Sequence, residues 1–343
     1  MARPQIRRRT LASTAAAVAL TAGCSDDDAG ETSSDTRTPS SSPASLSDPP
    51  SEPASEPRSA EPSAEATSEP ASPSLQLDDL DTAIALAAID RLAGRIGPRH
   101  ATSPAYAEAA RWVAGELEEL GYRVRSQRVQ VPGGDSWGVL VEAGTSTNVV
   151  ARLPGTDLTE PHLVVGAHLD TVPQAPGAED NASGVGVLLA AATAASAART
   201  RLPVVFVAFG AEEPRGPSDA DHHYGSRAYV AALAPAERRA VRGMVSLDRV
   251  GMGAVVPVGT AVESDDPAHR EVLAAAERAG VKVQPDLNQS SDHWQFVQAG
   301  MPGVRLGSTP YAAYHSAGDL PGVIKPEQLT RTGRLLLAWL AGP

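Results

Sequence analysis

The sequence predicts an α/β fold, a three-layer sandwich in which helices flank a central, mostly parallel mixed β-sheet. Short apolar runs, typical of buried strands, occur at residues 148–153, 162–167 and 202–209. Segments with helical character occur between or after them, at residues 185–198, 267–279 and 326–340. Strands that alternate with helices favour a sheet covered on both faces, with its functional residues at the carboxyl ends of the strands.

The remaining elements follow in chain order from about residue 75. Apolar positions over residues 80–92 fit one face of a helix, and a second helix is predicted over residues 103–120. Ser103 suits the N-cap of that second helix, and Gly121 suits its end. Residues 122–131 alternate between apolar and polar, as a half-exposed strand does. Further strands are predicted at residues 244–248, 255–258 and 304–306.

Composition excludes several classes of function. The chain has 343 residues and a formal net charge of −12, whereas sequence-independent nucleic-acid binding needs clustered Lys and Arg. We therefore expect no nucleic-acid partner. Cys24 is the only cysteine, which excludes an internal disulfide framework and a thiolate zinc cluster. Any metal must be held by histidines and carboxylates.

The first 24 residues are typical of an export signal. A basic stretch precedes an apolar run at residues 11–22 that is too short to span a bilayer well. The run ends at Ala22-Gly23-Cys24, which resembles a bacterial lipobox, in which the cysteine is lipidated. We expect an exported protein anchored by lipid on Cys24 to the extracellular face of the cell membrane; the alternative is an ordinary cleaved signal and a secreted protein.

The rest of the chain divides into two parts. Residues 25–74 are rich in Ser, Pro and Glu and almost lack apolar residues, so we expect a disordered linker. Residues 75–343 carry the predicted strands and helices and form the expected catalytic domain.

Histidines and carboxylates occur at five places along this domain, mostly directly after predicted strands. They are His168 with Asp170, Asp180, Glu212 with Glu213, Asp248, and His315. Imidazole nitrogen and carboxylate oxygen are zinc ligands, and two zinc ions can share a carboxylate and a water. His168, Asp180, Glu213, Asp248 and His315 supply such a ligand set.

Two pairs of neighbouring residues suit supporting roles. His168 and Asp170 are two apart, so on extended backbone they face the same way and Asp170 can accept a hydrogen bond from the His168 ring. Adjacent Glu212 and Glu213 point apart, so one can bind metal while the other reaches the bridging water. A glutamate beside a metal-bound water can act as a general base.

Six motifs in order resemble the M28 family of zinc aminopeptidases, in particular the bacterial secreted aminopeptidases, over about residues 80–340. They are Gly166-Ala167-His168-Leu169-Asp170-Thr171, Asp180-Asn181-Ala182-Ser183-Gly184, Ala211-Glu212-Glu213, Ser246-Leu247-Asp248, Ser291-Asp292-His293-Trp294-Gln295-Phe296 and Tyr314-His315-Ser316. The resemblance implies a zinc-exopeptidase-like fold and two Zn²⁺ ions.

The resemblance also implies a role for each residue. His168 and Asp248 would hold one zinc, Glu213 and His315 the other, and Asp180 would bridge them. Glu212 would be the general base, Tyr314 would help to stabilise the oxyanion, and the Asp180-Asn181 peptide would be cis. The implied substrate is a peptide or small protein with a free N-terminus, from which N-terminal residues are hydrolysed.

The sequence departs from the family at two positions. Ser290 stands where some secreted relatives have Arg, and Arg249 where many have Met. Residues 214–224 resemble an insertion that could form a lid, and we expect His222 and His223 to lie in a solvated loop. Alternative functions are a glutaminyl cyclase with one zinc, a carboxypeptidase or dipeptidase of the same fold, and a non-catalytic peptide-binding ectodomain.

Overall fold

The computed structural model describes residues 72–343. The predicted signal at residues 1–24, Cys24, and the linker up to residue 71 lie outside the described residues. Within residues 72–343, none of the helices has the length and apolarity that crossing a membrane requires.

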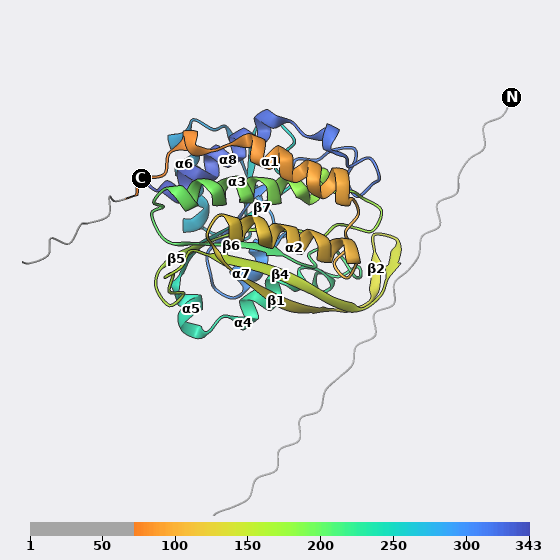
Figure 1. Ribbon diagram of the computed structural model, residues 1–343. Coiled ribbons are helices and arrows are strands. Elements are labelled where there is room, and N and C mark those ends of the chain that lie inside the picture. Colours follow the sequence, from red (N-terminus) through yellow and green to blue (C-terminus); the bar gives the residue numbers. More distant parts are fainter. Residues whose placement is uncertain (1–71) are drawn as a thin grey trace, which may run out of the picture. The chain divides into compact units, whose positions relative to one another are not determined.

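The predicted mixed sheet is confirmed. Its eight strands lie in the order β1-β4-β6-β5-β7-β10-β8-β9 (Figure 1). Their bounds in that order are Arg123–Val131, Gly144–Arg152, Val204–Phe209, His162–His168, Val241–Asp248, Gly303–Gly307, Val256–Thr260 and Val283–Leu287. The central strands β6, β5, β7 and β10 run parallel. On one side β1 and β4 pair antiparallel, and on the other β8 runs antiparallel to β10 and parallel to β9.

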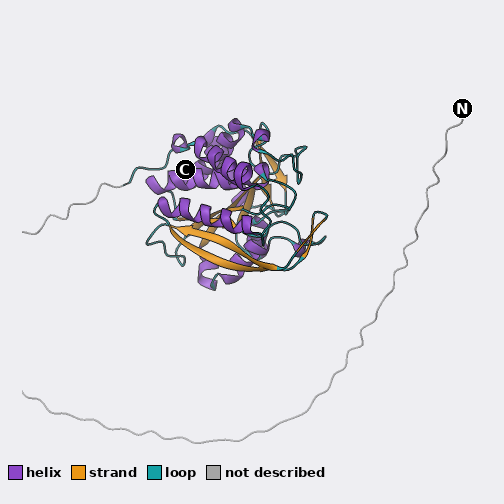
Figure 2. Ribbon diagram, turned by 45° about the vertical axis from the view of Figure 1, so that its right-hand side comes forward, coloured by secondary structure: helices purple, strands orange, loops and turns teal. Residues whose placement is uncertain are grey.

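Helices cover both faces of the sheet, so the strands lie between two helical layers (Figure 2). One layer contains α1 (Thr82–Ile89), α2 (Pro104–Glu119), α3 (Ser183–Ala197), α6 (Pro267–Ala279) and α8 (Pro326–Ala341). The other contains α4 (Tyr224–Ala232), α5 (Pro235–Ala240) and α7 (His293–Gln298). A separate hairpin is formed by β2 (Gly134–Ser136) and β3 (Val139–Val141).

Strand β5 shows why the central strands are apolar throughout. Successive side chains of a strand point to opposite faces. Leu163 and Val165 pack into the core beneath α3, whereas Val164 packs with Tyr229 and Phe296 of the opposite layer. Because both faces are buried, the sequence of β5 is a continuous apolar run rather than an alternating one.

The predicted ends of α2 are confirmed, with Ser103 at its N-cap and Gly121 directly after its C-cap. The Ser103 hydroxyl accepts a hydrogen bond of 3.0 Å from the Tyr106 N–H and caps α2. The first predicted helix is shorter than expected, because α1 ends at Ile89 and the chain continues as a wider helical turn over Asp90–Ile96.

Several short elements were not predicted, and each has a local reason. Strand β9 reads Val-Gln-Pro-Asp-Leu, which has poor strand propensity, and it lies at the edge of the sheet beside β8. Helices α4, α5 and α7 have nine residues or fewer, which is too short for helical periodicity to stand out.

Candidate metal centre and active site

The predicted site residues meet at the carboxyl ends of the parallel strands. His168 ends β5 and Asp248 ends β7, while Glu212 follows β6 after two intervening residues. Asp180 lies in the turn before α3, and His315 lies in the loop after β10. Together with Glu213 they line one cavity of about 310 Å³. The strand order thus brings together residues that are up to 147 positions apart in the sequence.

Asp180 lies between the two histidines. Its Oδ1 is 3.1 Å from His168 Nε2, and its Oδ2 is 3.3 Å from His315 Nε2. The peptide bond between Asp180 and Asn181 is cis, as the resemblance implies. The two oxygens of the Asp180 carboxylate thus face two different groups of side chains, one around His168 and one around His315.

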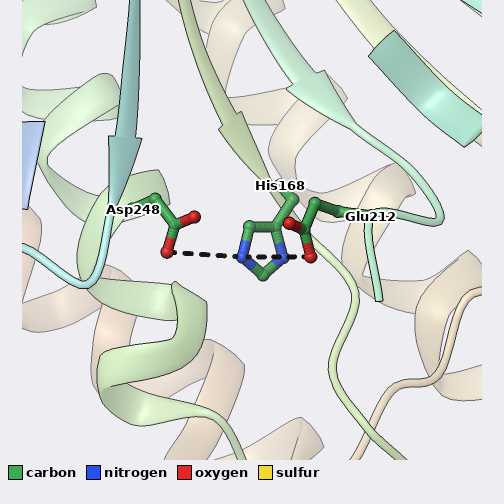
Figure 3. A group of neighbouring side chains, drawn as sticks. All are labelled: His168, Glu212 and Asp248. Carbon is green, nitrogen blue, oxygen red and sulfur yellow. Dashed lines mark ion pairs between the residues drawn. The ribbon is translucent and has the colours of Figure 1, made fainter. Parts of the chain in front are cut away.

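Each histidine has a second carboxylate beside it. His168 Nε2 is 3.8 Å from Asp248 Oδ1, and His315 Nε2 is 3.3 Å from Glu213 Oε2. In Figure 3 the His168 ring lies between the carboxylates of Asp248 and Glu212. The distance from Glu212 Oε2 to His168 Nε2 is 4.0 Å. By these shortest contacts, His168 with Asp248 and His315 with Glu213 form two sets that share Asp180. Ligand atoms also lie within 4.8 Å of one another in the groups His168, Glu212 and Asp248, and His168, Asp180 and Glu213.

The environment of these acids fits bound cations. The four acids, Asp180, Glu212, Glu213 and Asp248, are at most 8% exposed. Burial raises the pKa of Glu212 and of Glu213 to about 8. Burial alone would raise the pKa of Asp180, but the two imidazoles beside its carboxylate lower it. Glu213 Oε1 has no hydrogen-bond partner within residues 72–343. Buried anions gathered without cations are unfavourable, and a donor set of imidazole and carboxylate suits zinc.

His168 is oriented by a backbone carbonyl rather than by the Asp170 side chain. The ring Nδ1 lies 3.2 Å from the main-chain oxygen of Asp170 but 3.7 Å from its carboxylate Oδ1. Because a carbonyl oxygen only accepts, this contact requires the proton on Nδ1 and leaves the Nε2 lone pair facing the cavity. The prediction that the Asp170 carboxylate accepts a hydrogen bond from the ring is therefore wrong.

The Asp170 carboxylate instead holds the backbone of the two glutamates. It is fully buried, its Oδ1 accepts the Glu212 N–H at 3.0 Å and its Oδ2 accepts the Glu213 N–H at 3.2 Å. Asp170 thus positions both acids at once.

A family model described as Peptidase family M28 matches residues 148–340, which is more than half of the chain. The chain belongs to peptidase family M28. Aminopeptidase YwaD of Bacillus subtilis (strain 168) is 31% identical over 206 residues, which cover 57% of this chain and 44% of that protein. This M28 chain spans less than half the length of the curated relatives it matches.

Solved structures share the fold of this M28 chain. BSAP, a zinc aminopeptidase from Bacillus subtilis, aligns with a TM-score of 0.67 and 20% identity over 76% of this chain and 94% of that one. A Porphyromonas gingivalis glutaminyl cyclase aligns with a TM-score of 0.65 and 22% identity over 77% and 98%. Similarity at this level of identity shows the fold alone, and it agrees with the predicted sandwich.

A second buried carboxylate, which was not predicted, positions Asp180 of the M28 site. Asp319 accepts the N–H of Glu179 at 2.9 Å and the N–H of Asp180 at 3.1 Å. The Tyr311 hydroxyl donates to the same carboxylate at 2.9 Å. Asp319 lies 139 residues after Asp180, and no motif in the sequence connects the two.

Two aromatic rings hold His315. Tyr314 stacks on it, with ring centroids 3.7 Å apart, and Trp137 contacts it edge-on at 4.5 Å. Trp137 comes from the turn between β2 and β3, and no motif in the sequence marks it as part of the site. Burial, and then the charge of Asp180, raise the pKa of Tyr314, so its hydroxyl stays protonated and can donate a hydrogen bond.

The prediction for His223 is wrong. It is only 5% exposed, and its Nε2 lies 3.1 Å from Glu212 Oε1, whereas a solvated loop was expected. His222 is half-buried. Residues 214–224 form a wall of the cavity through Pro214, Asp219, His222 and His223.

Arg305 is a further residue that the sequence did not reveal. It stands in the middle of β10, is 1% exposed, and places Nη2 3.0 Å from Asp248 Oδ1. An arginine inside an apolar strand is an outlier in the sequence, and here its charge is balanced by the carboxylate at the end of the neighbouring strand β7.

Proposed function

We propose that this M28 chain is a metal-dependent exopeptidase that hydrolyses N-terminal residues from peptides. The observation that supports this best is the position of Asp180, whose two oxygens face the His168 set and the His315 set separately. Such an arrangement suits a carboxylate shared between two metal ions. The aminopeptidase among its relatives supports the reaction class.

The ligand assignment follows the two sets of donor atoms. His168 and Asp248 would hold one zinc, Glu213 and His315 the other, and Asp180 both. When bound, zinc ions lower the pKa of a water and polarise the scissile carbonyl.

Glu212 is the proposed general base. Its Oε1 lies 3.1 Å from His223 Nε2, and its Oε2 faces the cavity beside His168. From there it can accept a proton from the attacking water and pass it to the leaving amine. Tyr314 can donate a hydrogen bond to the oxygen that gains negative charge. Trp137 closes one side of the cavity.

The test compares leucine anilide with its N-acetylated form, using the purified protein with and without chelator. The proposal predicts cleavage of the free-amine substrate alone, lost with chelator and restored by zinc. Zinc is measured in the same samples. No cleavage of either substrate with two zincs bound would contradict the proposal. It would favour a dipeptidase, a carboxypeptidase or a non-catalytic ectodomain, and cyclisation of a peptide with N-terminal Gln would favour a glutaminyl cyclase.

We also propose that the enzyme acts outside the cytoplasm, tethered through lipid on Cys24 and a linker over residues 25–74. The basic and apolar pattern of residues 1–24 supports this, as does the single cysteine in the chain. Metabolic labelling with a radioactive fatty acid tests it. Label should enter the wild-type protein and not Cys24→Ser, which should be released from the membrane fraction. Equal membrane association of the two proteins would contradict the anchor.

A further inference from the structure

Two arginines line the cavity within the described residues, and they are bound very differently. Both terminal nitrogens of Arg305 have partners: Nη2 contacts Asp248, and Nη1 donates to Asn288 Oδ1 at 3.1 Å and to the carbonyl and hydroxyl oxygens of Ser290 at 2.9 and 3.0 Å. It is also almost completely buried. Arg305 therefore has a structural role beneath the site.

Arg249 has most of its hydrogen-bonding capacity free. Of the five N–H donors of a guanidinium, one is used within residues 72–343, a bond of 2.9 Å from Nη2 to Ser308 Oγ. Nε is 3.6 Å from Asp248 Oδ1, which is beyond hydrogen-bond distance. The side chain is 14% exposed and lines the cavity.

The position of Arg249 is fixed on several sides. Its guanidinium carbon lies 4.5 Å from the centre of the Tyr314 ring. Its backbone N–H donates to Asn181 Oδ1 at 3.2 Å, and its carbonyl accepts the Ser308 N–H at 3.1 Å. The backbone is left-handed, with a φ of 57°, which is unfavourable for an arginine and is typical of functional sites.

We propose that Arg249 binds a carboxylate of the substrate next to the scissile bond. A guanidinium fork matches a carboxylate in shape and charge, and a fixed fork loses little entropy on binding. Because Arg249 Nε lies 3.6 Å from Asp248 Oδ1, beside a proposed metal ligand, we place that carboxylate on one of the residues flanking the cleaved bond. It is either the side chain of an acidic N-terminal residue or the C-terminal carboxylate of a dipeptide. This inference rests on the proposed exopeptidase function.

Matched substrate pairs test the two sources of the carboxylate. Glutamate anilide is compared with glutamine anilide, and Leu-Leu with its C-terminal amide. We expect kcat/KM to favour the charged member of one pair by about tenfold or more. Arg249→Met should abolish that preference mainly through KM, and Arg249→Lys should restore part of it. Arg242→Met is the control, because Arg242 is exposed at the opposite end of β7 and should leave the preference unchanged.

The outcomes separate this proposal from the proposed function. Turnover without preference in either pair would overturn the role of Arg249 while leaving the exopeptidase function intact. A preference that survives Arg249→Met, or an equal loss on all four substrates, would overturn it as well. If the enzyme turns over none of them, calorimetric titration of the zinc-loaded Glu212→Gln protein with Leu-Leu and its amide, and with free glutamate and glutamine, gives the same test through Kd.

Discussion

Substituting Asp170 by asparagine separates the two roles that an acid beside His168 can have. The structure places both Asp170 oxygens on backbone N–H groups, of Glu212 and Glu213, and places the His168 ring on the Asp170 main-chain oxygen. Asp170→Asn keeps one acceptor oxygen and turns an amide NH₂ towards the other N–H. The main-chain contact with His168 is unchanged.

The expected magnitude follows from these contacts. A hydrogen bond to a charged group contributes about 1.5–3 kcal/mol, and a buried donor left without a partner costs about 1–3 kcal/mol. Asp170→Asn loses one such bond and weakens the other, so we expect the free energy of unfolding to fall by about 2–4 kcal/mol. Because Glu212 and Glu213 lose their shared support, kcat should also fall, by about tenfold to a hundredfold.

The assay is urea unfolding in the presence of chelator, so that bound metal does not contribute to stability. Zinc content and kcat are measured separately on the reconstituted protein. We expect lower stability and lower kcat with zinc bound at the His168 set. Loss of that zinc with unchanged stability would refute the reasoning, because it would show that the carboxylate acts on the ring and not on the backbone of the glutamates.

Three further predictions follow from the site and its surroundings. Glu212→Gln should retain zinc and lose kcat by about a hundredfold or more, measured on leucine anilide; near-full activity would remove Glu212 as the base. Trp137→Ala should raise KM and weaken zinc retention by loosening His315, with little change in thermal stability, since Trp137 is 54% exposed; an unchanged KM would exclude a role in the site. Gly225→Ala should reduce the soluble yield or destabilise by more than about 2 kcal/mol in urea, because its methyl would collide with the backbone carbonyl of Gly210; wild-type stability would show that the backbone can move there.

The sheet and the proposed ligands could be predicted because their signals are local. A strand buried on both faces is a visible apolar run, and each proposed ligand from a strand follows such a run within a few residues. His168 and Asp248 are the clearest cases, since each is the last residue of its strand. Parallel strands place their carboxyl ends at the same edge of the sheet, so no further sequence signal is needed to predict that these residues lie together.

The remaining parts of the site depend on contacts between distant segments. His223 faces Glu212 only because the segment of residues 214–224 lies along the cavity, and Trp137 reaches His315 only because the β2–β3 hairpin extends that far. Neither residue stands in a pattern that predicts its partner. Arg305 had a visible signal, a charge inside an apolar strand, but its partner Asp248 is 57 residues away.

The acids that support the site share one geometry, which explains why sequence alone assigned Asp170 the wrong partner. Each of three buried carboxylates accepts two consecutive backbone N–H groups, one on each oxygen. Asp170 binds the N–H groups of Glu212 and Glu213, Asp319 those of Glu179 and Asp180, and Glu179 those of Gly251 and Met252. Two of these three segments contain a proposed ligand, and the third begins three residues after Asp248. A carboxylate used in this way fixes the direction of a loop backbone, whereas in the sequence it looks the same as a ligand or as a partner of a histidine ring. The backbone amides, which carry no sequence signal, therefore decide which acids face the cavity and which acids hold it in shape.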